Sequence, residues 1–84
     1  MKFCKVFDVK RYQQIVMLKE VDEDGDHQIR VYFHPEGYGL SSFVMAWPKD
    51  SGIKAGDVFK GMVMQDAIEV VDKFMAHTAY GGEH

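Results

Sequence analysis

The amino-acid sequence predicts an α+β fold, in which an antiparallel four-stranded β-meander is followed by one or two C-terminal helices packed on one sheet face. Short apolar segments with a period of two fill residues 3–47, and turn-forming residues separate them. Beyond Pro48, apolar residues recur at helical spacing instead. Because short turns favour pairing between consecutive strands, the sheet order is expected to follow the sequence order.

The four strands are expected at about residues 3–9, 12–21, 27–34 and 40–47. The first is short and predicts an edge strand. The second contains a continuous apolar run from Ile15 to Leu18, which predicts an interior strand covered on both faces. The third alternates cleanly, so Ile29, Val31 and Phe33 are expected to face the core. The fourth has apolar residues on both sides and ends at Pro48.

Two stretches of turn residues connect the later strands. Asp22-Glu23-Asp24-Gly25-Asp26 predicts a hairpin, because Asp24-Gly25 suits the positive φ angles of a tight turn. The proline and glycines of residues 34–39 predict a second reversal.

The helices are expected at about residues 51–61 and 66–78. Asp50-Ser51 offers an N-cap for the first, which Gly52 and Gly56 weaken. Asp66, with Glu69 three positions later, matches a capping box for the second. Apolar residues then recur at helical spacing as far as Thr78, which predicts one stripe packed on the sheet.

The bulk properties indicate one small domain spanning residues 1–84, with 46% hydrophobic and 27% charged residues. A single cysteine, Cys4, cannot form an internal disulfide, and its strand position beside Val6 predicts burial. Neither a signal peptide nor an apolar run long enough to span a membrane is recognisable, so a cytoplasmic protein without membrane contact is expected.

Charge is distributed unevenly along the chain. The formal net charge is -3, which argues against a dedicated nucleic-acid binder. Lysines and Arg11 dominate residues 1–19, whereas residues 20–26 are strongly acidic. This asymmetry could steer a charged partner toward the molecule.

No metal site or cofactor is expected. Asp22, Asp24 and Asp26 have the spacing of the first half of an EF-hand calcium loop, but His27 replaces the glycine and Phe33 the glutamate that such a loop requires. A solvated hairpin tip is the better interpretation. His27 and His34 should point to opposite faces of one strand, so they do not predict a zinc site.

The sequence does not predict an enzyme, because no acid, base and nucleophile can be assembled from the spacing. It predicts more apolar strand surface than the helices can cover, and hence a non-catalytic protein-interaction domain. This domain would bind a protein partner or form a homodimer through an open sheet face or through the exposed edge at residues 3–9. A specific version is a stoichiometric inhibitor or immunity-type protein with an acidic surface. The residues expected to contact the partner are Tyr12, Tyr32, Asp22, Asp24 and Asp26.

An alternative function is binding of single-stranded nucleic acid. The basic N-terminal segment would contact phosphates, and the bases would stack on sheet aromatics. The candidate aromatics are Phe3, Phe7, Tyr12 and Tyr32.

Overall fold

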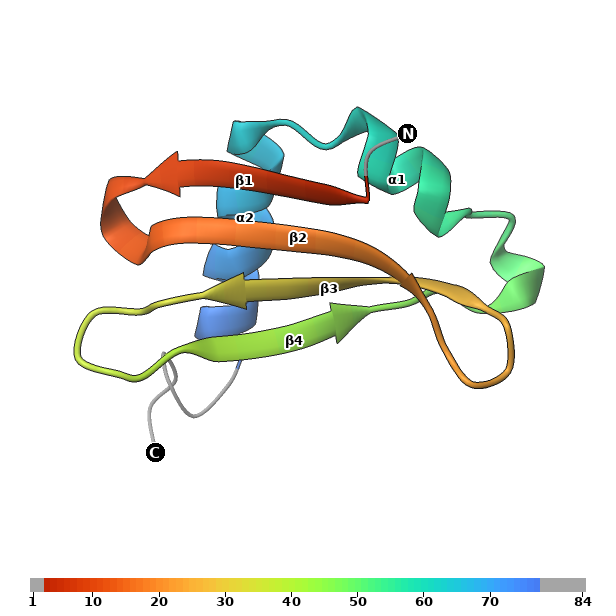
Figure 1. Cartoon of the computed structure of the whole chain (residues 1–84), viewed down its shortest axis with the longest axis horizontal. Helices are drawn as coiled ribbons and strands as arrows, with labels where there is room; N and C mark the ends of the chain where they lie inside the picture. Colours follow the sequence, from red (N-terminus) through yellow and green to blue (C-terminus); the bar gives the residue numbers. More distant parts are fainter. Residues whose placement is uncertain (1–2, 78–84) are drawn as a thin grey trace.

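A computed structural model describes residues 3–77 and contains the predicted four strands and two helices. The strands are β1 (Cys4–Val9), β2 (Gln13–Val21), β3 (His27–Phe33) and β4 (Ser41–Met45). The helices are α1 (Ala55–Gly61) and α2 (Met64–Ala76), and two short 3-10 turns are η1 (Lys10–Tyr12) and η2 (Lys49–Ser51). All neighbouring strands are antiparallel in the order β1-β2-β3-β4, so the predicted meander is confirmed (Figure 1).

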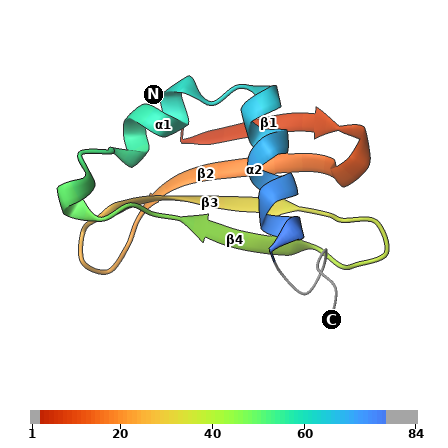
Figure 2. The ribbon, with the colours of Figure 1, turned by 180° about the vertical axis from the view of Figure 1, so that it is seen from behind.

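Both helices pack on the same side of the sheet (Figure 2). Helix α1 contacts β2 and β3, whereas α2 crosses the strands from β1 towards β4. Near the end of α2, the Phe74 ring stacks on Phe43 of β4 with their centroids 4.3 Å apart. None of the helices within residues 3–77 has the length and apolar character needed to cross a bilayer.

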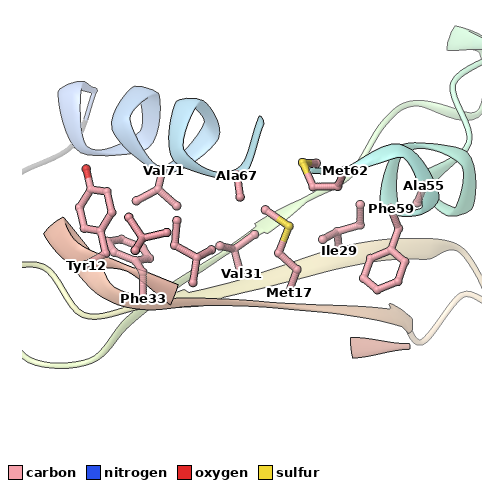
Figure 3. Packing of buried hydrophobic residues seen from close by; sticks show 12 residues of the cluster. Tyr12, Met17, Ile29, Val31, Phe33, Ala55, Phe59, Met62, Ala67 and Val71 are labelled. Carbon is pink, nitrogen blue, oxygen red and sulfur yellow. The ribbon is translucent and has the colours of Figure 1, made fainter. Parts of the chain in front are cut away.

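The hydrophobic core fills the space between the sheet and the helices (Figure 3). Ile15, Met17, Ile29, Val31 and Phe33 are fully buried there, opposite small and branched residues of α2 such as Ala67 and Val71. The predicted inward face of residues 27–34 is therefore confirmed. Burial of each large side chain contributes about 1.5–3 kcal/mol.

Helix α1 begins at Ala55, so the predicted start at Ser51 is wrong. The Ser51 hydroxyl donates to the Pro48 carbonyl (2.7 Å) and accepts the N–H of Ile53 (3.1 Å). Ser51 thus stabilises η2 and does not cap the helix, because serine side chains also satisfy the backbone of tight turns.

Helix α2 begins at Met64, which makes the prediction of Asp66 as its N-cap wrong. Asp66 lies in the first turn, where its carboxylate accepts the N–H of Val63 (3.2 Å). The acid also complements the positive end of the helix dipole. The predicted end at Thr78 lies outside the described residues.

The junction between η1 and β2 reverses the direction of one aromatic side chain. Gln13 has φ 63° and ψ -68°, a strained conformation for a residue with a side chain. It interrupts the strand alternation, so Tyr12 turns under α2 and is only 5% exposed.

The Tyr12 hydroxyl donates to the Asp72 carboxylate, which Arg11 also contacts at 3.2 Å. Burial, followed by this bond to Asp72, raises the pKa of Tyr12 to about 12.

A lysine ties the edge strand β1 to α1. Lys5 Nζ donates to the backbone carbonyls of Phe59 (2.5 Å), Lys60 (3.1 Å) and Met62 (3.0 Å). These carbonyls belong to the C-terminal turn of α1, where cations interact favourably with the helix dipole. The end of the helix is thereby fixed over the sheet edge.

Candidate interaction surface

The side of the sheet opposite the helices, called the open face here, is built by strand alternation. Because Ile15 and Met17 of β2 point into the core, Gln14, Val16, Leu18 and Glu20 point the other way. Residues directly opposite each other on neighbouring strands share a face, so the pairing extends this assignment across the sheet. Within residues 3–77 both helices lie on the other side, and no helix covers the open face (Figure 2).

Apolar side chains occupy two adjacent cross-strand rows of the open face. One row runs Cys4, Leu18, Arg30, Val44 and the next runs Val6, Val16, Tyr32, Ser42. We define the open-face patch as the six members of these rows other than Arg30 and Ser42, namely Cys4, Val6, Val16, Leu18, Tyr32 and Val44. Val6 is 52% exposed and Val44 39% exposed, while Val16, Leu18 and Tyr32 are half-buried by their neighbours alone. All four strands thus contribute apolar side chains to this face, and Arg30 lies between Leu18 and Val44.

Polar side chains border the open-face patch at both ends. At one end, Glu20 accepts hydrogen bonds from Gln28 (2.7 Å) and Arg30 (2.9 Å). The bond from Gln28, followed by that from Arg30, lowers the pKa of Glu20 below its ordinary value. At the other end, Gln14 donates to Asp8 (3.2 Å). An apolar centre with a polar rim is the usual composition of a protein interface.

A shallow hollow of about 200 Å³ continues the patch at the Gln14 end. Its walls include Val16, Tyr32, His34 and Leu40, of which Leu40 is 71% exposed. The strained Gln13 also lines it and directs its amide towards the His34 ring, with 3.5 Å between Nε2 and Nδ1. Backbone strain of this kind concentrates at functional sites.

The structure brings together some of the predicted partner-binding residues. Tyr32 lies in the open-face patch, and Asp22 and Asp24 lie at the β2–β3 turn, beside the Glu20 end of the open face. Asp26 closes the same turn, where its carboxylate pairs with Lys49 (3.4 Å). A strand over residues 12–21, as predicted, would place Tyr12 on the same face as Tyr32. This is wrong, because the Gln13 conformation directs Tyr12 to the other side of the sheet.

Four members of the patch were not among the residues singled out from the sequence, namely Val6, Val16, Leu18 and Val44. The period-two pattern could have placed them on one face, but it does not say which face the helices cover. The predicted cover on both faces of the second strand is wrong, because no helix among residues 3–77 covers Val16 and Leu18. Cys4 shares that face with Val6, as expected, yet its predicted burial is wrong because this is the uncovered side.

The three aspartates of the β2–β3 turn converge, with carboxylate oxygens within 4.8 Å of one another. Asp22 Oδ1 accepts the backbone N–H groups of Asp24 and Asp26, both at 2.9 Å. Gly25 supplies the positive φ angle of 84° that the turn requires. These contacts explain the aspartate spacing as a way of stabilising the predicted hairpin.

The residues required for nucleic-acid binding are not assembled on one surface. Phe7 packs against the core, and Lys5 is engaged by the carbonyls of α1. Tyr12 is buried, and Arg11 pairs with Asp72. Of the four candidate aromatics, Phe3 and Tyr32 remain accessible, and the Phe3 ring already lies under Lys19 Nζ, 5.6 Å from the ring centroid.

No protein-family model matches this chain, and neither the curated proteins nor the solved structures contain a significant match.

Proposed function

We propose that this chain is a small non-catalytic protein-interaction domain that binds a protein through the open-face patch. The supporting observation is that six residues, drawn from all four strands, form two adjacent rows without a covering element among residues 3–77. Apolar side chains gathered on an uncovered sheet face favour an interaction site in a folded domain. Tyr32, on the interior strand β3, is one of the residue types that most often anchor such contacts.

The acidic β2–β3 turn extends this surface. Asp22, Glu23 and Asp24 border the open face next to Glu20. Arg30 neutralises Glu20, whereas Glu23 and Asp24 are exposed. In the inhibitor or immunity-type version of this proposal, the turn would guide a partner with basic groups, and the association would weaken as salt increases.

Photocrosslinking tests the proposal in the cells from which the protein comes. p-Benzoylphenylalanine replaces Tyr32 in the patch or, as a control, the exposed Glu69 on α2. We expect a discrete protein adduct from position 32 that is lost when Val6→Glu is added, and no such adduct from position 69. Equal labelling from both positions, or none from position 32, would refute the proposed use of the open face.

A further inference from the structure

The open-face patch is arranged to pair with a second copy of itself, and we propose that this chain forms a face-to-face homodimer. The two-fold axis lies midway between the two sheets. It runs parallel to the sheet planes and perpendicular to the strands. This inference rests on the proposed function and specifies the partner. It follows from the order of the rows along the strands and from the position of the acidic turn.

The row order makes the face self-complementary. A two-fold axis perpendicular to the strands places each strand over its own copy and reverses the direction along it. The row containing Leu18 and Arg30 then faces the row containing Val16 and Tyr32 of the second copy. Leu18 meets Val16, and the Arg30 guanidinium meets the Tyr32 ring, an arrangement that favours a cation–π contact.

The polar ends also match under this operation. Glu20 and Gln28 of one copy face Gln14 and His34 of the other, so hydrogen-bonding groups meet hydrogen-bonding groups. Arg30 enters the interface already paired with Glu20, which reduces the cost of removing either charge from water.

The acidic turn distinguishes between the two possible orientations. A two-fold axis parallel to the strands would bring the turns formed by residues 22–26 of both copies to the same end, where their negative charges repel. The perpendicular axis places them at opposite ends. Each then lies at the end of the other copy where β2 begins and β3 ends, so the two groups of carboxylates are kept apart.

The dimensions of the sheet suit such a contact. Four strands about 4.8 Å apart and about 24 Å long cover roughly 450 Å² in projection. Side-chain relief makes the accessible area larger than the projection. The projected area is a little over half of the approximately 800 Å² that each partner contributes to a standard interface, so the contact would be a small one that uses the whole face.

Sedimentation velocity at micromolar concentrations tests the association. We expect a dimer whose dissociation constant rises at least about 100-fold in Val6→Glu, because the symmetry introduces two buried carboxylates at once. Val63→Glu is the matched control, since Val63 is 57% exposed, close to the 52% of Val6, and lies between the helices. A monomeric wild type, or a dimer equally sensitive to both substitutions, would overturn the inference.

Cys4 reports the orientation. In the proposed dimer the two Cys4 residues are offset by about 7 Å along the strands, across sheets about 10 Å apart. Bismaleimidoethane, a short thiol-to-thiol reagent, should therefore join them. With the axis parallel to the strands, the two residues would lie at the same height along the strands but would be separated sideways by about 14 Å, which the short reagent cannot bridge. A dimer that only a much longer bismaleimide can join would refute the perpendicular axis.

A matched thiol controls for random collision. Lys60→Cys in a Cys4→Ser background carries one exposed thiol on the helix side, and we expect no covalent dimer from it.

The sedimentation and photocrosslinking results together separate this inference from the proposed function. If the wild type is monomeric while the crosslinker at position 32 captures a different protein, the second-copy inference fails and the proposed function stands. If position 32 captures nothing and no dimer forms, both fail.

Discussion

Replacing Tyr12 by phenylalanine should produce a stability loss that disappears at alkaline pH. The substitution removes a hydrogen bond to the charged Asp72, worth about 1.5–3 kcal/mol. The pKa of Tyr12 is raised from 10.0 to about 12 in the folded protein. A difference of two units corresponds to about 2.7 kcal/mol in favour of the protonated form. That contribution is complete below pH 10, the unfolded value, and is lost as the pH rises towards 12.

Urea unfolding of wild type and Tyr12→Phe across this pH range measures the effect. The other titrating groups are common to both proteins, so the difference in unfolding free energy isolates Tyr12. We expect a difference of about 2 kcal/mol near pH 9 that shrinks steadily above pH 10. A difference that stays constant over the whole range would show that the Tyr12 hydroxyl does not titrate as its buried contact with Asp72 requires.

Three further substitutions test contacts of the fold by urea unfolding. Lys5→Met should destabilise the protein by about 1–3 kcal/mol, because three carbonyls lose their donor. The control Lys10→Met, at an exposed position, should cost less than about 0.5 kcal/mol. Equal losses in the two variants would contradict the contact between Lys5 and α1. Gln13→Gly should raise the free energy of unfolding by about 1 kcal/mol, since glycine accepts φ 63° without strain. A clearly lower stability of this variant would show that Gln13 is unstrained. Asp22→Ala should lower the free energy of unfolding by about 1 kcal/mol, because two backbone N–H groups lose this acceptor. Asp24→Ala should lower it much less. A larger loss in Asp24→Ala than in Asp22→Ala would contradict the turn geometry.

The strand arrangement was predictable because it depends on local signals. The hairpin at residues 22–26 requires only a glycine with positive φ and an aspartate that accepts neighbouring N–H groups. Strand alternation then places Ile29, Val31 and Phe33 on one face. Short turns and a period of two therefore determine both the order of the strands and the division of their residues between two faces.

The errors occur where a single backbone angle or a competing turn changes the pattern. Alternation extrapolated through Gln13 puts Tyr12 on the same face as Tyr32, but the positive φ of Gln13 reverses it. Ser51 is equally suited to a helix cap and a 3-10 turn, and contacts with Pro48 and Ile53 decide the outcome. Which face the helices cover depends on tertiary packing, so the exposure of Cys4 could not be derived from its strand pattern.

The late position of both helices has a consequence during synthesis on the ribosome. The meander can form from neighbouring segments, whereas Lys5 meets its carbonyl acceptors only 54 or more residues further along the chain. Until α1 and α2 emerge, the nascent sheet would expose Phe33 and its neighbours on one side as well as the valines on the other. A ribosome-bound fragment of this kind is prone to aggregation, so a holding chaperone would matter most before residues 55–76 emerge.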